Sequence, residues 1–572
     1  MKKRTLKAIK RISRQSGKAP PARVIESGRK DPRRARRDAK RLIRRELAER
    51  EEEGRKSFAS LPPRFNVADA LLDANLRAGR RGKVALRSGG ESLTYGQLAE
   101  LANRTGNMLL GLGLRQESRV ALILRDSFEF AISFLGSIKA GLVPVPFNTF
   151  LRPRDHAFLL NDSRAGVALV DAQLFPGLEA LRGELPFLKE LVCVGGGGEG
   201  HCFESLLSLA SAELGPADTH RDEPAFWLYT SGSTGRPKAA VHLHHDIVFC
   251  CEAFGRHVLE IGHQDVTFSI SKLFFAYGLG NNLFYPFYVG ATALLNPEPA
   301  RAEEALALIH RERPTIFFAV PTFYAAMLEV EGAQERFDLS SLRLCISAGE
   351  PLPPELYHRW QERFGLEILD GIGSTEMLQT FISNRPGCVK PGSSGTLVPG
   401  YEAKVVDEGG REVPHGQVGS LLVRGDSSSP YYWNRHQESK LAMQGGWVRT
   451  GDRYQRDEDG YFWYSGRSDD MLKVGGIWVS PLEVERALAA HPAVREAAVV
   501  GAPDRRGLIK PKAFVALRDG HEPARELARE LIEFVKGSLA SHKVPRWVEF
   551  LEELPKTATG KIRRFELREK TE

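Results

Sequence analysis

A stretch in the middle of the chain carries residue types that could hold a polyphosphate. It consists of Thr230, Ser231, Gly232, Ser233, Thr234 and Gly235, followed closely by Lys238. The glycines let backbone N–H groups face inward, the hydroxyls add donors, and the lysine adds a positive charge. The stretch is not a Walker-type loop, because Pro237 precedes the lysine and Ala239 stands where a Ser or Thr would hold Mg²⁺. A solvated Ser/Gly turn has the same composition, so the alternative of a plain turn stays open.

A second group of candidate residues lies further along, in Gly373-Ser374-Thr375-Glu376. Three of the four residues 366–369 before it are apolar, and they predict a short strand that stops just before Asp370. A carboxylate beside two hydroxyls offers a hard oxygen ligand for Mg²⁺, the ion that usually accompanies ATP. Glu376 could instead be a charge at a helix N-terminus, where it interacts favourably with the helix dipole.

Two charged residues nearer the carboxyl end complete the candidate set. Asp452 lies in Thr450-Gly451-Asp452, a turn whose carboxylate could bind both hydroxyls of a ribose, although such turns are common. Lys561 lies in a Thr- and Gly-containing segment close to the carboxy terminus, from which it could reach the cleft of a neighbouring domain. An exposed, solvated lysine is the alternative interpretation of Lys561.

Layered helices and strands are needed to position these residues. Apolar strand patterns alternate with amphipathic helix patterns from residue 60 onward, with strands expected at 119–124, 142–146 and 165–170. This alternation predicts an α/β fold in which helices cover the faces of layered sheets and ligands bind at strand ends. A β-rich segment with many Gly and Asp turns is expected at 395–464.

A chain of 572 residues is too long for a single hydrophobic core. We predict a basic N-terminal extension at 1–59, disordered or helical, and a large domain at 60–466. A small, mobile C-terminal α+β domain is predicted at 467–572, with the joint near residue 469.

The net charge of +8 belongs to the N-terminal extension. Residues 1–56 hold 22 Lys or Arg and eight Asp or Glu, so the rest of the chain is mildly acidic. The extension could be a solvated tail, a tether for nucleic acid or an anionic membrane, an organelle-targeting segment, or the product of a start codon placed too early. The chain lacks runs of about 18 apolar residues, and its six cysteines lack metal-binding spacing, which together predict a cytoplasmic protein without disulfides.

Taken in order, these segments resemble the adenylate-forming superfamily of acyl-CoA ligases, adenylation domains and luciferases. The resemblance extends from about residue 62 to residue 568. It depends on the Ser/Thr/Gly loop, Gly373-Ser374-Thr375-Glu376, Thr450-Gly451-Asp452, Gly466-Arg467-Ser468-Asp469 and Gly560-Lys561. Within the superfamily, residues 272–281 and 370–378 make the chain most similar to the benzoate–CoA ligase branch.

The resemblance implies a role for each matching residue. The β- and γ-phosphates of ATP would be bound by Thr230, Ser231, Gly232, Ser233, Thr234, Gly235 and Lys238. Adenine would contact Gly349, Glu350, Pro351, Asp370, Gly371 and Ile372, and the ribose would contact Asp452 and Arg467. Thr375 would contact the α-phosphate, Glu376 would hold Mg²⁺, and Lys561 would bridge the acyl carboxylate and the α-phosphate. The acyl group would lie among Ala276, Tyr277, Gly373, Gln379 and Thr380. Asp469 would be the hinge, and coenzyme A would be faced by Lys473, Gly475, Gly476 and Trp478.

The implied reaction has two half-reactions that need different arrangements. A carboxylate first attacks the α-phosphorus of ATP, where Lys561 stabilises the developing charge and Mg²⁺ on Glu376 stabilises the leaving pyrophosphate. A thiol then attacks the acyl carbon in the place that Lys561 held. A small domain that turns on a hinge at Asp469 would allow both steps.

The expected activity is ATP-dependent ligation of an aromatic acid to coenzyme A, as in the degradation of aromatic compounds. A homodimer is compatible with the sequence. Gln379 and Thr380 depart from the branch, which usually has a His and an aliphatic residue there. Both would suit a hydroxy- or aminobenzoate better than benzoate, unless Gln379 bonds to backbone. The alternatives are transfer to a carrier protein, a medium-chain fatty acyl-CoA ligase, and a non-enzymatic sensor with a nucleic-acid-binding tail.

Overall fold

The computed structural model describes residues 61–196, 202–231, 237–467, 470–474, 477–505, 508–556 and 562–571. The predicted N-terminal extension lies outside these ranges. Within them, helices and strands alternate as an α/β fold, which confirms the predicted class. The helices of the described ranges are all too short or too polar to cross a bilayer.

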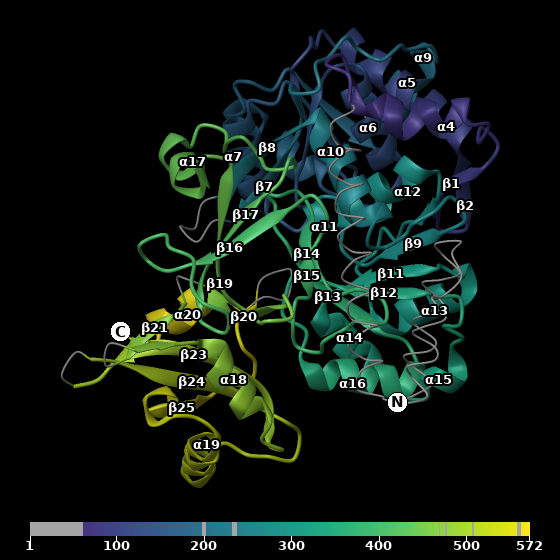
Figure 1. Cartoon of the computed structure of the whole chain (residues 1–572). Coiled ribbons are helices and arrows are strands. Elements are labelled where there is room, and N and C mark those ends of the chain that lie inside the picture. The colour runs from purple at the N-terminus through teal and green to yellow at the C-terminus, as the bar shows by residue number, and fades with distance from the viewer. Residues whose placement is uncertain are drawn as a thin grey trace, which may run out of the picture.

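A nine-stranded sheet lies at the centre of the larger part of the molecule (Figure 1). In spatial order it consists of β15 (Thr396–Leu397), β14 (Thr380–Ser383), β13 (Ile368–Gly373), β12 (Leu344–Ser347), β11 (Ile316–Ala319), β9 (Val266–Ser269), β10 (Thr292–Leu294), β1 (Val84–Ser88) and β2 (Glu91–Thr94). Neighbours are parallel from β13 to β1 and antiparallel at the outer pairs. Because parallel strands end at the same edge, the segments that follow β12 and β13 start close together.

Strand β13 is longer than the sequence predicts. The expected strand stops before Asp370, whereas β13 continues to Gly373 because its last residues pair with β14. Gly373 permits this pairing, since a Cβ there would lie 2.7 Å from the carbonyl oxygen of Gln379. The Thr375–Glu376 segment therefore leaves a strand that is hydrogen-bonded on both sides.

Helices cover both faces of the nine-stranded sheet. One face carries α13 (Ala302–Glu312), α14 (Pro321–Leu328), α15 (Ala333–Arg336) and α16 (Pro354–Phe364), and Figure 1 shows the last three below the strands. The other face carries α10 (His244–Cys250), α11 (Ala276–Leu279), α12 (Tyr285–Val289) and the π-helices Cys251–Arg256 and Gly280–Phe284. Proline is the first residue of α14 and α16, where no intrahelical N–H bond is lost.

A second, four-stranded sheet is entirely parallel, in the order β4 (Val143–Pro146), β3 (Arg119–Ile123), β5 (Val167–Asp171) and β6 (Glu190–Val194). These strands confirm the three predicted at 119–124, 142–146 and 165–170. The helices of this region are α4 (Ala74–Arg77), α5 (Tyr95–Gly111), α6 (Phe128–Lys139), α7 (Pro153–Ser163), α8 (Phe175–Glu179) and α9 (Phe203–Leu209). Beside β4 lies the antiparallel pair of β7 (Pro224–Ser231) and β8 (Pro237–Leu243), which the predicted phosphate loop connects.

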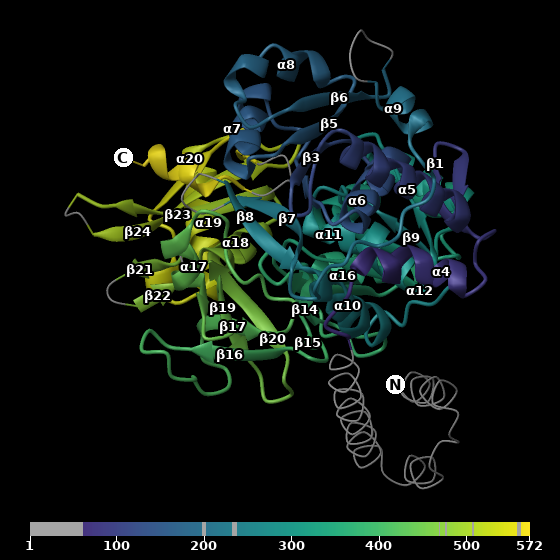
Figure 2. The same cartoon turned by 90° about the horizontal axis from the view of Figure 1, so that it is seen from above.

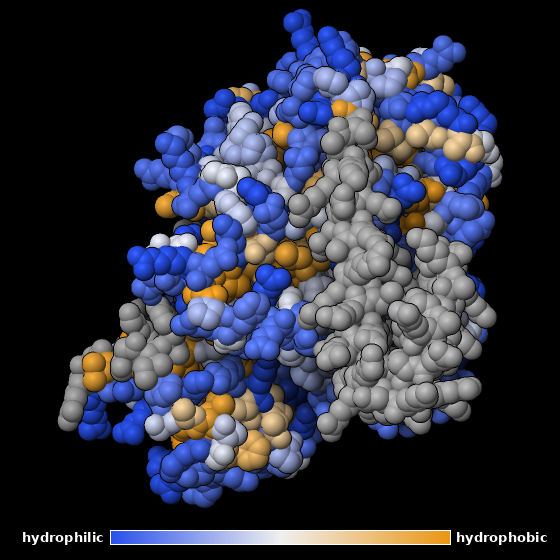
Figure 3. Space-filling view, in the orientation of Figure 1, coloured by the Kyte–Doolittle hydropathy of each residue, from blue (hydrophilic) through white to orange (hydrophobic). Residues whose placement is uncertain are grey.

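The predicted β-rich segment is confirmed. Its sheet runs β16 (Glu402–Val406), β17 (Gly419–Arg424), β19 (Trp447–Arg456) and β18 (Met443–Gln444), with β20 (Phe462–Arg467) also paired to β19, and α17 (His436–Ala442) lies near its edge. The face shown in Figure 3 is mostly hydrophilic, and apolar side chains gather near the middle, where Figure 1 shows β16 and β17.

The residues after β20 build a smaller α+β part, which lies beside the β16–β20 sheet in both views (Figures 1 and 2). Its strands are β21 (Leu472–Val474), β22 (Ile477–Val479), β23 (Val494–Pro503), β24 (Ile509–Leu517) and β25 (Trp547–Phe550). Its helices are α18 (Pro481–Ala489), α19 (Arg525–Ser538) and α20 (Arg564–Glu569). These elements have their own hydrophobic cluster, which includes Val484, Leu488 and Val499, and α18 contacts β20. The three-domain division itself stays a prediction.

Candidate functional site

Lys238 and Glu376 contact the same side chain, that of Tyr432. Lys238 lies on β8 opposite Thr230 of β7, and its Nζ is 5.4 Å from the centre of the Tyr432 ring. The Tyr432 hydroxyl donates to Oε1 of Glu376 over 2.7 Å. Burial, reinforced by the Glu376 charge, raises the pKa of Tyr432 far above its ordinary value, so the hydroxyl keeps its proton. A cation and a carboxylate are thus linked beside the strands that flank the predicted phosphate loop.

The residues predicted to contact adenine lie at neighbouring strand ends. They are Gly349, Glu350 and Pro351, which follow β12, and Asp370, Gly371 and Ile372, which belong to β13. The Asp370 side chain is buried, and this burial raises its pKa to about 8. The N–H of Leu352 and the positive charge of Arg486 on α18 act against the shift. The smaller part of the molecule therefore influences the charge state of a residue in the candidate adenine site.

The two residues predicted to bind ribose are in contact. Asp452 of β19 faces Arg467 of β20 in register, and Nη1 of Arg467 lies 3.2 Å from Oδ1 of Asp452. The same nitrogen donates to the carbonyl oxygen of Thr450 over 3.1 Å. Thr450, Gly451 and Asp452 lie within β19, not in the turn that the sequence predicts. Gly451 has a φ of 78°, and a Cβ there would lie 2.8 Å from the Arg467 guanidinium, so this position in the strand requires glycine.

The residues predicted to surround the acyl group come together between α11 and β14. They are Ala276, Tyr277, Gly373, Gln379 and Thr380. Gln379 donates from Nε2 to the carbonyl oxygen of Ala276 and accepts from the Tyr285 hydroxyl over 2.9 Å. Both the nitrogen and the oxygen of this buried amide are therefore bonded within the protein, which supports the alternative in which Gln379 bonds to backbone.

The sequence model of the AMP-binding enzyme family matches residues 73–433, and that of the AMP-binding enzyme C-terminal domain matches residues 483–561. The chain belongs to the AMP-binding enzyme family. The match to the first model spans the β7–β8 pair and the Thr375–Glu376 segment, and the second begins in α18.

This AMP-binding enzyme is similar to two curated ligases. It is 48% identical to the benzoate–CoA ligase of Thauera aromatica over 510 residues, which cover 89% of this chain and 96% of that protein. It is 43% identical to the 4-hydroxybenzoate–CoA/benzoate–CoA ligase of Rhodopseudomonas palustris over 511 residues, which cover 89% of this chain and 94% of that protein.

Two solved structures share the fold of this AMP-binding enzyme over most of its length. An anthranilate CoA ligase in complex with anthranoyl-AMP has a TM-score of 0.85 and 45% identity, covering 90% of this chain and 99% of that one. A benzoate CoA ligase from Burkholderia xenovorans has a TM-score of 0.81 and 43% identity, covering 88% of this chain and 100% of that one.

Several predicted site residues lie outside the residues that the structure describes. They are Gly232, Ser233, Thr234, Gly235, Asp469, Gly475, Gly476 and Lys561. The side chains of Ser231, Lys473 and Trp478 are not described either, although the backbones of Lys473 and Trp478 pair across β21 and β22.

Three residues that the motifs do not single out contact the candidate site: Tyr432, Tyr285 and His242. Tyr432 is 56 positions from Glu376, and Tyr285 is 94 positions from Gln379, so no spacing rule could have joined them. His242 stands four positions after Lys238, and its closeness to the phosphate loop was a usable signal.

Proposed function

We propose that this AMP-binding enzyme ligates an aromatic carboxylic acid to coenzyme A through an acyl-AMP intermediate, with ATP converted to AMP and pyrophosphate. The observation that supports this most strongly is the fold shared over 90% of the chain with a ligase bound to anthranoyl-AMP. The shared contact of Lys238 and Glu376 with Tyr432 adds support, because a cation and a hard oxygen ligand suit a metal-bound polyphosphate.

In the first half-reaction, the carboxylate of the acid attacks the α-phosphorus of ATP and pyrophosphate leaves. We assign the phosphates to the loop before Lys238 and to the Lys238 ammonium. The Asp452 carboxylate accepts from the ribose hydroxyls, and Arg467 orients it through their salt bridge. Thr375 contacts the α-phosphate, and Lys561 neutralises the two anions that must approach each other.

A magnesium ion fits this site if the nucleotide supplies most of its ligands. Across the described ranges, no three His, Cys, Asp or Glu side chains are grouped closely enough to hold a metal ion. Mg²⁺ is commonly bound by one or two carboxylates together with phosphates and water, and Glu376 supplies such a carboxylate. When bound, the ion would stabilise negative charge on the leaving pyrophosphate.

In the second half-reaction, the thiol of coenzyme A attacks the acyl carbon and AMP leaves. Lys561 has to vacate the space beside that carbon, so we propose that residues 467–572 turn at Asp469 between the steps. The turn would bring Gly475 and Gly476, flanked by Lys473 and Trp478, toward the thiol. The contact of α18 with β20 would have to change in this movement.

The acyl pocket that we propose is lined by Ala276, Tyr277, Gly373 and Thr380. Burial holds the pKa of Tyr277 well above its ordinary value, so its hydroxyl stays neutral. Because Gln379 is bonded to Ala276 and Tyr285, the case for a substituted ring no longer rests on Gln379. We propose benzoate or a hydroxy- or aminobenzoate as the substrate, by similarity to the relatives.

The test is a panel of benzoates, phenylacetates, cinnamates and medium-chain fatty acids, assayed for pyrophosphate release with and without coenzyme A. We expect aromatic acids to support pyrophosphate release and ATP–pyrophosphate exchange, and we expect a thioester of coenzyme A as the product when coenzyme A is present. Exchange without thioester formation would favour transfer to a carrier protein, and no exchange with any acid would refute the proposal. A cytoplasmic location and a homodimer stay predictions.

A further inference from the structure

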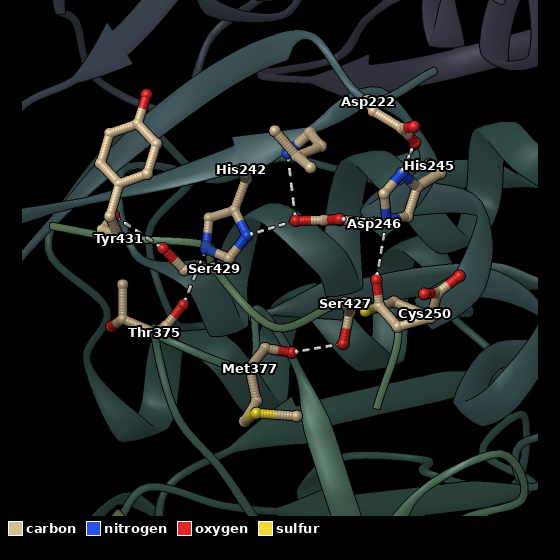
Figure 4. A network of polar contacts seen from close by, with 12 residues as sticks. Asp222, His242, His245, Asp246, Cys250, Thr375, Met377, Ser427, Ser429 and Tyr431 are labelled. Carbon is tan, nitrogen blue, oxygen red and sulfur yellow. Dashed lines mark hydrogen bonds and ion pairs between the residues drawn. The ribbon is translucent and has the colours of Figure 1, made fainter. Parts of the chain in front are cut away.

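Three consecutive backbone carbonyls in the segment 375–377 each accept from a donor outside the segment, and Figure 4 shows the first and the third of these contacts. The first and third carbonyls also accept from the N–H groups of Leu378 and Gln379. Nε2 of His242 lies 2.8 Å from the carbonyl oxygen of Thr375. The next carbonyl oxygen accepts from the N–H of Ser429 over 2.7 Å, and the third accepts from Oγ of Ser427 over 2.9 Å. A carbonyl oxygen can only accept, so the ring nitrogen of His242 must carry the proton in the first contact.

The ring of His242 is itself fixed in place. Its Nδ1 lies 2.8 Å from Oδ2 of Asp246, and neither side chain is exposed to solvent. The same carboxylate oxygen accepts from the N–H of Leu243 over 3.1 Å, and its other oxygen lies 3.2 Å from Nε2 of His245. The ring of Phe226 stacks on the imidazole with centroids 5.2 Å apart. These contacts leave His242 with one orientation, in which Nε2 points at the Thr375 carbonyl.

The backbone of segment 375–377 is therefore held from two sides, by His242 on one side and by Ser427 and Ser429 on the other; we call these three residues and the segment the clamp. His242 belongs to β8, the strand that begins with Pro237 and Lys238, and Asp246 belongs to α10. On the other side, the Ser427 hydroxyl is bonded to the Tyr401 hydroxyl at 2.8 Å. With its backbone oxygens held, the segment can direct its side chains toward a ligand without rearranging.

We propose that His242, oriented by Asp246, is a positioning residue for adenylation. It holds the backbone of Thr375 so that Thr375 and Glu376 stay directed at the nucleotide, and it ties their segment to the strand that carries Lys238. A buried histidine that only stabilises the core is the ordinary alternative. The positioning role is favoured over this alternative because His242 bonds to the backbone of Thr375, which is 133 positions away in sequence and next to the proposed metal ligand Glu376. The inference rests on the proposed function.

Two matched substitutions separate the contacts of His242. His242→Gln keeps a donor near the position of Nε2, which faces the Thr375 carbonyl. His242→Asn keeps a donor near the position of Nδ1, which faces Asp246. A positioning role predicts that the Gln variant retains about tenfold more adenylation activity than the Asn variant, since only Gln retains the donor to Thr375. A role in core stability predicts equal losses.

His244→Ala is the control for loss of a buried imidazole. His244 is also buried, and its Nδ1 accepts from the N–H of Val67, away from the clamp. We expect His244→Ala to lower thermal stability without the selective loss described below.

Ser427→Ala removes the donor to the Met377 carbonyl and so tests segment 375–377 from the side opposite to His242. It is a smaller change, so the proposal stays testable if the His242 variants fold poorly.

Each variant is measured in three ways with benzoate: ATP–pyrophosphate exchange, thioester formation from supplied benzoyl-AMP, and calorimetric affinity for ATP with Mg²⁺ or with EDTA. We expect His242→Asn and Ser427→Ala to lose exchange and to lose the affinity gained from Mg²⁺. Thioester formation should fall less than exchange, because benzoyl-AMP retains the α-phosphate but not the pyrophosphate that Mg²⁺ would bind. Equal loss in both half-reactions, or an unchanged Mg²⁺ gain, would overturn the positioning role. If the wild-type enzyme shows no ATP–pyrophosphate exchange with any acid of the panel, the proposed function fails. If the wild-type enzyme does show exchange, but the His242 variants and His244→Ala have equal exchange rates, only the positioning role fails.

Discussion

Replacing Tyr432 with phenylalanine tests whether the contact between Tyr432 and Glu376 matters for adenylation. The substitution keeps the ring that lies 5.4 Å from the Lys238 ammonium and removes the hydroxyl that donates to Glu376 over 2.7 Å. Tyr432 is 7% exposed, so water cannot easily replace the lost donor. The variant therefore changes one hydrogen bond to a carboxylate and little else.

The expected size of the effect follows from that bond. A hydrogen bond to a charged group contributes about 1.5–3 kcal/mol. Glu376 is only partly buried, so we take the lower value, which corresponds to about a tenfold fall in the rate of adenylation. Removing Glu376 itself should have a larger effect. In a Glu376→Gln background, Tyr432→Phe should then add little, because the hydroxyl would act through a carboxylate that is no longer there.

The assay is ATP–pyrophosphate exchange with benzoate, compared with thioester formation from supplied benzoyl-AMP. Tyr431→Phe is the matched control, because Tyr431 is adjacent in sequence, is 39% exposed and points away from the clamp in Figure 4. We expect a selective loss of exchange in Tyr432→Phe. If Tyr432→Phe and Tyr431→Phe lie within about twofold of each other in exchange, the proposed role of the Tyr432–Glu376 contact is wrong.

Four further outcomes are expected. Lys561→Ala should reduce exchange by about 100-fold or more and spare thioester formation from benzoyl-AMP; equal loss in both would contradict its assignment. Deleting residues 1–56 should leave kcat and KM within about twofold, and a large fall would show that the extension belongs to the fold. Because the pKa of Asp370 is raised from 3.8 to about 8, its neutral form stabilises the folded state, and this stability is lost as pH rises from the lower value through the higher one. Asp370→Asn should therefore gain in Tm relative to wild type between pH 5 and pH 9, and a constant difference would refute the shift. Gln379→Ala should lower stability by about 1–3 kcal/mol in urea unfolding without changing the ranking of aromatic acids, and a changed ranking would place Gln379 against the substrate.

The sequence predicts the fold well where a local pattern decides it. Runs of apolar residues at 119–124 and 165–170 identify β3 and β5, because a buried parallel strand reads as a continuous apolar stretch. The prediction fails at the end of β13, where Asp370 and two glycines look like a turn. Pairing with β14 keeps those residues extended, and a partner strand is not visible in the local sequence.

The candidate site is predictable only in part, for the same reason. Motif residues such as Asp452 and Arg467 are found by their local sequence, and the structure brings them into contact on the paired strands β19 and β20. Gln379 shows the limit, because its two partners, Ala276 and Tyr285, lie about a hundred residues away. The type of a residue indicates what it can bind, whereas its partners are chosen by the tertiary fold.

The segment that carries Thr375 and Glu376 ends in a backbone conformation that only a fixed environment would retain. Leu378 has a φ of 63°, a left-handed conformation that costs a residue with a side chain about 1–2 kcal/mol. Its side chain is fully buried in the main core, which contributes about 2 kcal/mol and offsets that cost. The core thus holds one end of the segment while His242, Ser427 and Ser429 hold its carbonyls. Because the segment is held at Leu378 and at its carbonyls before any nucleotide binds, adenylation need not supply the free energy of ordering Glu376. Weakening either set of contacts should therefore first slow adenylation.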